Sequence, residues 1–267
     1  MATSELDQDR IVGINEPEQP EEEEEQGATM SLVEHLEELR RRIFISAIAI
    51  VLFSIIAFIF REQILHLLTL PLPTSALGIK NAKTSYPLAV DTVGGSFTVF
   101  LKLSVAVGIA LSAPVILYQL WAFVAPGLTR RERKWAGPFV LIGVLLFFVG
   151  IVVGFLTLRC PVQWLIDFGQ GDFLELVTAD NYFTFIAFFM LAFGIVFELP
   201  LVLTFLAQIG LVSSQMLRRK RAVALISLWI LSTVLTPGTD PYSPVILGVA
   251  MTVLFELSII MIRVTKK

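Results

Sequence analysis

The chain has 267 residues, of which 55% are hydrophobic and 16% are charged, whereas about 25% of the residues in a typical soluble domain are charged. Its formal charge of −3 conceals an acidic N-terminal segment, because residues 1–29 contain ten acidic residues and one arginine. The one cysteine, Cys160, excludes an intramolecular disulfide, and two isolated histidines argue against a zinc site, so we expect neither a metal nor a cofactor.

The N-terminal part of the chain divides into two segments. Residues 1–29 offer too little apolar surface to offset the entropy of ordering, which predicts a disordered acidic tail. Residues 30–42 predict a short amphipathic cytoplasmic helix, with three leucines on one face and charged residues on the other. We expect this helix to lie along the membrane surface before the chain turns into the bilayer.

Six apolar segments follow, and together they predict a transmembrane domain over residues 43–262. Their approximate ranges are 43–60, 97–125, 138–158, 182–208, 222–235 and 244–262. The second is longer than a bilayer needs and is interrupted by Pro114, whereas the fifth is short, because a hydrocarbon core about 30 Å thick needs about 20 helical residues. Residues 263–267 form a basic C-terminal tail. The expected fold class is an all-α polytopic membrane protein with six transmembrane helices.

The basic residues predict the orientation of these helices. Most of the 20 lysines and arginines flank the segments on the side of the N-terminus. They form the clusters Arg40–Arg42, Arg130–Lys134, Arg218–Arg221 and Arg263–Lys267. The positive-inside rule therefore places both termini in the cytoplasm or an equivalent compartment such as a stroma.

One ionisable residue, Glu198, lies near the middle of the fourth segment, two residues before Pro200. A carboxylate at bilayer depth costs about 2.5–3.5 kcal/mol on insertion scales and usually faces a bundle interior or a cavity. Glu198 is therefore either a neutral, hydrogen-bonded packing residue or a functional one. In the third segment, Gly150 and Gly154 form a small-xxx-small pattern, which predicts a close helix-packing face.

The loop after the second segment contains an acidic residue that topology alone does not explain. Interface anchoring accounts for Trp121 and Phe123, and topology accounts for the basic residues, but neither accounts for Glu132 among four bases. A second acidic pair, Glu37 and Glu38, precedes the cluster Arg40–Arg42 and is expected on the same side of the membrane.

Four motifs resemble those of the TatC family, in the same order. They are HLEELR at residues 35–40, SAPVILYQ at 112–119, WAF at 121–123 followed by Pro126 and by Glu132 with Arg133, and FGIVFELP at 193–200. The resemblance extends from about Met30 to the end of the chain. It implies a glove-shaped bundle that acts as a receptor subunit of the twin-arginine protein translocase, not as an enzyme. Such a subunit recognises twin-arginine signal peptides and nucleates the complex that exports folded proteins, driven by the protonmotive force.

The resemblance also implies roles for individual residues. Glu38 and Glu132 would bind the signal peptide, with Leu39, Arg40 and Phe123 in the surrounding motifs. A guanidinium pairs with a carboxylate through directional, charge-assisted hydrogen bonds, which suits a paired-arginine ligand.

Four further positions are secondary candidates. Asp240 resembles a polar turn between the last two segments, and Glu256 either snorkels or pairs across helices. Pro114 and Pro126 are possible structural residues.

The resemblance implies partners and a location as well. The partners would be TatA- and TatB-type single-span proteins docking on the fifth and sixth helices, the signal peptides, membrane lipid and further copies of the chain. Glu198 would lie on the concave face of the bundle, near where a partner helix or the signal peptide packs. The membrane would be a bacterial inner membrane or a thylakoid membrane. The alternative function is a proton-coupled small-solute transporter that uses Glu198 as its relay.

Overall fold

The computed structural model describes residues 32–72, 88–124, 136–168, 177–238 and 240–265, and these are almost entirely helical. The helices are α1 (Leu32–Ile59), α2 (Arg61–Thr69), α3 (Gly95–Val124), α5 (Ala136–Thr157), α6 (Arg159–Phe168), α7 (Ala179–Phe197), α8 (Leu199–Gln208), α9 (Ser214–Arg219), α10 (Arg221–Leu235) and α11 (Tyr242–Thr265). One isolated bridge pairs Ala89 with Thr178 in the described part of the chain.

Within the described ranges, five helical stretches are long and apolar enough to cross a bilayer. They are Val33–Ile59, Gly95–Val124, Gly137–Phe168, Ala179–Gln208 and Tyr242–Val264. The predicted all-α polytopic membrane fold is therefore confirmed. Helix α10 has 15 residues, so at 1.5 Å per residue it is only about 22 Å long. It is the shorter apolar helix that the sequence predicts as the fifth span.

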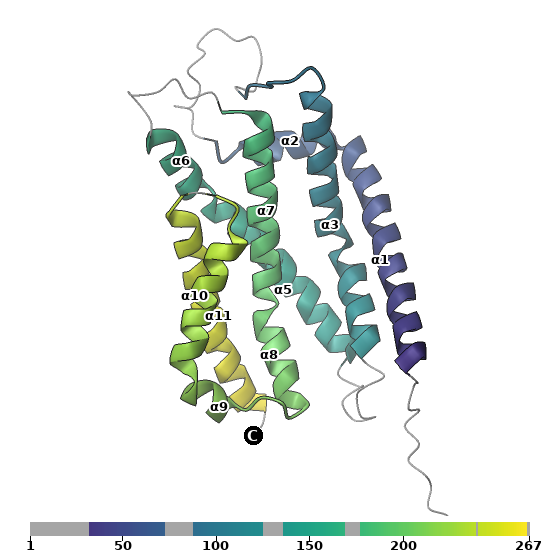
Figure 1. Ribbon diagram of the computed structural model, residues 1–267, viewed down its shortest axis with the longest axis vertical. Coiled ribbons are helices and arrows are strands. Elements are labelled where there is room, and N and C mark those ends of the chain that lie inside the picture. Colours follow the sequence, from purple (N-terminus) through teal and green to yellow (C-terminus); the bar gives the residue numbers. More distant parts are fainter. Residues whose placement is uncertain (1–31, 73–87, 125–135, 169–176, 239, 266–267) are drawn as a thin grey trace, which may run out of the picture.

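The helices form a bundle with α7 in its middle (Figure 1). Helices α1 and α3 pack side by side at one edge, α10 and α11 pack together at the other, and α5 runs obliquely against α7. The start of α1 and the ends of α3 and α11 lie at one end of the bundle with α9, whereas α2 and α6 lie at the opposite end (Figure 1). The hydroxyl of Tyr182 on α7 donates a 3.0 Å hydrogen bond to the carbonyl of Leu68, which fixes α2 against α7.

Glycines bring α5 and α7 into close contact. A Cβ on Gly150 would lie 2.6 Å from the carbonyl oxygen of Phe193, and one on Gly154 would lie 3.0 Å from the Cβ of Phe193. From the other helix, a Cβ on Gly194 would lie 2.7 Å from the ring of Phe147. The predicted packing face is therefore confirmed.

Three helix boundaries differ from the expectations. Residues 32–59 form one helix in place of a surface helix followed by a span, because no glycine or proline interrupts them. Helix α3 continues through Pro114, because its packing against α1, α5 and α7 holds the helix together where the proline lacks a donor. The expected segment 182–208 is divided between α7 and α8, because Pro200 cannot donate a helical hydrogen bond and its ring crowds the preceding turn.

Candidate functional site

Glu38 lies where the first turns of α1 meet the last turns of α3. Its Oε1 atom accepts hydrogen bonds from Nε and Nη2 of Arg42, with the Nε bond at 3.0 Å. Nη1 of Arg42 also donates to Oε1 of Gln119 on α3 at 3.1 Å. We call Glu38, Arg42 and Gln119 the α1–α3 seam. Arg42 thereby joins the two helices while neutralising part of the charge of Glu38.

The second carboxylate oxygen of Glu38 has no hydrogen-bond partner within the part of the chain that the structure describes. The side chain is 19% exposed, and that of Arg42 is 21% exposed. The Oε2 atom is buried and has no hydrogen-bond partner among the described residues. A buried carboxylate oxygen without a donor is unfavourable, because the energy of its hydration is lost and not replaced. The α1–α3 seam can therefore accept a further cationic donor.

An aromatic pair continues this contact between α1 and α3. The rings of His35 and Phe123 are stacked, with centroids 4.3 Å apart and an interplanar angle of 18°. Leu39 is half-buried and lies next to Glu38 in the sequence. The structure therefore brings Phe123, one of the predicted site residues, close to the α1 motif that contains Glu38.

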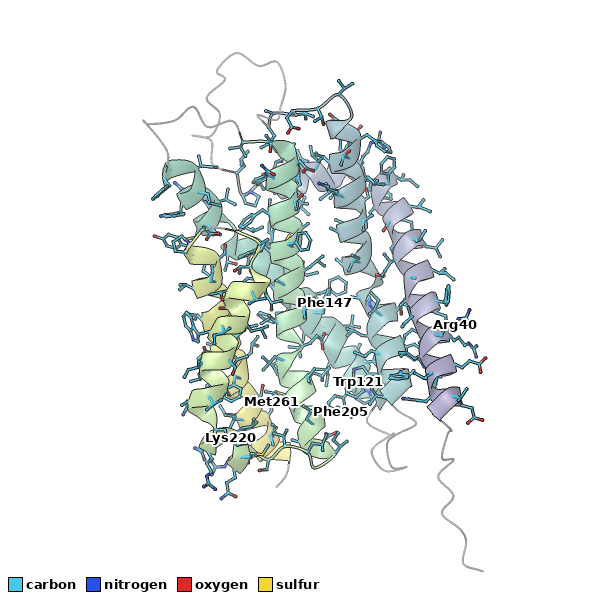
Figure 2. All side chains as sticks on the ribbon, in the orientation of Figure 1. Arg40, Trp121, Phe147, Phe205, Lys220 and Met261 are labelled. Carbon is cyan, nitrogen blue, oxygen red and sulfur yellow. The ribbon has the colours of Figure 1, made fainter. Side chains whose placement is uncertain are left out.

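Two other predicted positions lie differently. Arg40 is exposed on the outer side of α1, with its guanidinium carbon 5.8 Å from the centre of the Phe44 ring (Figure 2). It therefore points away from the α1–α3 seam. Glu132 and Pro126 lie outside the described residues. Their contribution to this site stays a prediction.

Glu198 occupies the junction between α7 and α8. Its carboxylate lies against α5, since a Cβ on Gly143 would be 3.2 Å from Oε2 and 3.5 Å from Oε1. Oε1 is buried without a hydrogen-bond partner among the described residues. The geometry leaves a buried polar atom that another helix could satisfy.

Asp240 and Glu256 have structural partners. Asp240 is 2% exposed, and its carboxylate accepts from the backbone N–H of Ser243 at 2.6 Å and from its hydroxyl at 2.7 Å. It caps the first turn of α11. Glu256 on α11 forms an ion pair with Arg221 at the start of α10. Of the two predicted possibilities for Glu256, pairing across helices is therefore the one observed.

The sequence did not predict three members of the site, namely His35, Arg42 and Gln119. The Glu38–Arg42 pair could have been found, because residues four apart on a helix are neighbours. The other two depend on how α1 packs against α3, which no local pattern gives. Among the described residues, no cluster of histidine, cysteine, aspartate and glutamate could hold a metal ion.

Comparison with known proteins identifies the family. A family profile described as "Sec-independent protein translocase protein (TatC)" matches residues 34–250. The Sec-independent protein translocase protein TatC of Carboxydothermus hydrogenoformans is 37% identical over 238 residues, which cover 89% of this chain and 94% of the relative. The chloroplastic protein of that name from Pisum sativum is 32% identical, over 85% of this chain and 62% of the relative.

Solved structures agree with the sequence matches. A crystal structure of the twin-arginine translocase receptor TatC in DDM matches with a TM-score of 0.71 and 29% identity, covering 85% of this chain and 99% of that one. A second crystal structure of the receptor matches with a TM-score of 0.72 and 28% identity. Both the sequence relatives and the fold thus point to one family. The chain belongs to the TatC family and is a component of a Sec-independent protein translocase, not an enzyme.

Proposed function

We propose that this chain is the translocase subunit that recognises twin-arginine signal peptides, and that Glu38 receives one of the two arginines. The observation that carries this proposal is the buried Oε2 atom of Glu38, which has no partner among the described residues. A guanidinium arriving at Oε2 would form a charge-assisted hydrogen bond, and Arg42 would keep Oε1 fixed. Glu132 is the proposed receiver of the second arginine.

The surroundings of Glu38 suit a peptide that presents an arginine pair. The stacked rings of His35 and Phe123 provide a flat surface against which a guanidinium or an apolar side chain can pack. Leu39 adds apolar contact beside the acidic group, and exposed Arg40 repels peptides that are merely basic. Pairing of the peptide arginines with acidic residues, together with repulsion of other basic peptides by Arg40, makes the site selective for the twin-arginine motif.

We propose that the Glu38 end of the bundle faces the cytoplasm or stroma. Basic residues gather at that end, as Arg40–Arg42 on α1, Arg218–Arg221 from α9 to the start of α10, and Arg263 on α11. With α10 counted as a sixth span, both termini lie on this side. The membrane is then a bacterial inner membrane or a thylakoid membrane, the two locations that the bacterial and chloroplastic relatives suggest.

Glu198 serves a different step in this proposal. Its unsatisfied Oε1 atom lies beside Gly143, where α5 presents no side chain to cover it. A polar group at this depth is best satisfied by a donor on another helix. We assign it to contact with a TatA- or TatB-type single-span partner, with α10 and α11 as the neighbouring docking face, during translocation driven by the protonmotive force.

The proposed signal-peptide site is tested by crosslinking a twin-arginine peptide to the purified protein. Glu38→Gln should lower the yield at least about tenfold, since hydrogen bonds to charged groups contribute about 1.5–3 kcal/mol. Glu37→Gln is the matched control, because Glu37 is the exposed neighbour. Unchanged crosslinking in Glu38→Gln, or equal loss in Glu37→Gln, would refute the assignment.

The acidic segment 1–29 lies outside this site in our proposal. It holds ten acidic residues and precedes the family match, which begins at residue 34. A solvated tail adds no contact that the export reaction needs. Deleting residues 1–29 should therefore leave both peptide crosslinking and export of a folded reporter unchanged, and loss of either would show that the tail takes part.

A further inference from the structure

A second surface of the molecule combines an apolar groove with a cation that forms no ion pair with any described residue. The groove has a volume of about 570 Å³ and lies between α1 and α3. Apolar side chains dominate its lining, among them Ile50, Ile55, Phe58, Phe97, Leu101 and Val105. Its hydroxyl groups belong to Ser54 and Ser104, and each donates a 2.7 Å hydrogen bond to the carbonyl four residues earlier. The groove therefore offers no unsatisfied hydroxyl donor to a ligand.

The length of the groove corresponds to one leaflet of a bilayer. From Ile50 to Ile59 along α1, nine helical steps span about 14 Å, roughly half of a hydrocarbon core about 30 Å thick. Its walls are open, since Ile55 is 55% and Phe97 is 63% exposed. No described element of the chain covers them. An occupant must come from outside the described fold.

Arg61 follows directly beyond the end of α1, two residues after Ile59. Its guanidinium carbon lies 5.3 Å from the centre of the Phe58 ring, which lines the groove, and 5.8 Å from that of Phe100. One long hydrogen bond, 3.4 Å from Nη1, reaches the carbonyl of Phe58. Within the described residues no carboxylate pairs with Arg61. Most of its five donors are therefore available to an anion.

Lys102, the neighbouring cation, is not available to bind an anion in the same way. Lys102 follows Leu101 on α3, and its ammonium group lies 2.7 and 2.9 Å from the two carboxylate oxygens of Asp180. Its charge is thus already compensated within the fold. Arg61 differs because aromatic rings, and not an acid, hold its guanidinium in place.

We propose that the α1–α3 groove and Arg61 together bind an anionic phospholipid of the leaflet opposite to that facing Glu38. The phosphate contacts the Arg61 guanidinium, and one acyl chain lies in the groove. A phospholipid presents this combination of one charge and one apolar chain of half-membrane length. The groove itself ends at Ile50, so its length matches one acyl chain and is short of a full transmembrane helix.

Lipid retention measured by native mass spectrometry tests the proposal. The purified full-length protein is equilibrated with phosphatidylglycerol or with phosphatidylcholine carrying the same acyl chains. Arg61→Gln should reduce retention of phosphatidylglycerol about fivefold relative to phosphatidylcholine, as expected for one basic side chain near a membrane surface. Arg61→Lys keeps the charge and should retain most of the preference.

Two further variants separate this site from general effects. Arg159→Gln removes an exposed charge at the same end of the bundle and should leave retention unchanged. Val51→Trp fills the groove at a position that is 58% exposed and should reduce retention of both lipids. Unchanged retention in Arg61→Gln or Val51→Trp, or equal loss in Arg159→Gln, would overturn the proposal. Displacement of the lipid by inorganic phosphate alone would also overturn it, as would crosslinking of Leu101 to a protein helix in membranes.

Discussion

Replacing Gly150 with alanine should weaken the contact between α5 and α7. The added Cβ would lie 2.6 Å from the carbonyl oxygen of Phe193 and 2.9 Å from the Cβ of Phe197. A backbone oxygen cannot rotate away, so the helices must separate, and overpacking of this kind costs about 1–3 kcal/mol. Alanine recovers up to about 1 kcal/mol of helix propensity. We expect a net loss of about 1 kcal/mol in the free energy of unfolding, or roughly 2–4 °C in Tm for a domain of this size.

Two other glycines of α5 provide the comparison for Gly150→Ala in thermal melts of purified protein. A Cβ on Gly154 would lie 3.0 Å from the Cβ of Phe193, a less severe contact than the 2.6 Å approach at Gly150, so Gly154→Ala should lose less. Gly137 has nothing within 4 Å, so Gly137→Ala should keep or raise the Tm. If Gly150→Ala melts at the parent temperature, α5 and α7 pack less closely than described, and the reasoning fails.

Three further outcomes are expected. Glu198→Ala should lower export of a folded reporter more than it lowers crosslinking of the twin-arginine peptide, and equal loss of both would indicate a folding defect. Asp240→Ala should lower the free energy of unfolding by about 1–2 kcal/mol, because it removes the carboxylate that accepts hydrogen bonds from Ser243 in the first turn of α11. Asp240→Asn should lose less, and thermal melts measure both variants. A double-mutant cycle on Arg221 and Glu256 should give a coupling below about 1 kcal/mol that shrinks with salt, since both side chains are partly exposed. A larger, salt-independent coupling would contradict the last expectation.

The helices could be predicted because their signals are local. Long apolar runs identified the membrane-length helices of the described residues, and the spacing of Gly150 and Gly154 identified a packing face. Proline was a weaker guide. Pro200 ends α7 while α3 continues through Pro114, although each residue lacks the same donor. The packing of neighbouring helices decides whether a proline ends a helix, and the proline alone does not predict that packing.

The candidate site was only partly predictable for a related reason. Glu38 was found through its motif, but the motif did not reveal that Arg42 already binds one oxygen of the carboxylate. Gln119 lies 77 residues from Arg42 in the chain, and only the packing of α3 against α1 brings the two together. Contacts between residues so far apart in the chain depend on how one helix is rotated and shifted against its neighbour. Hydrophobic periodicity does not determine this register with enough accuracy to predict the contact.

An aromatic cluster links the end of α3, which contributes Gln119 to the α1–α3 seam, with α8, which begins directly after Glu198. Trp121 of α3 packs 5.0 Å from Phe139 of α5 and 4.7 Å from Phe205 of α8, measured between ring centroids (Figure 2). Trp121 lies between Gln119 and Phe123 in the sequence, and Phe205 belongs to the helix that begins after Glu198. Because close-packed aromatic groups transmit displacement with little compression, this cluster fixes the end of α3 relative to α8. A signal peptide that moved the end of α3 at Glu38 would therefore also shift α8 and the groups around Glu198.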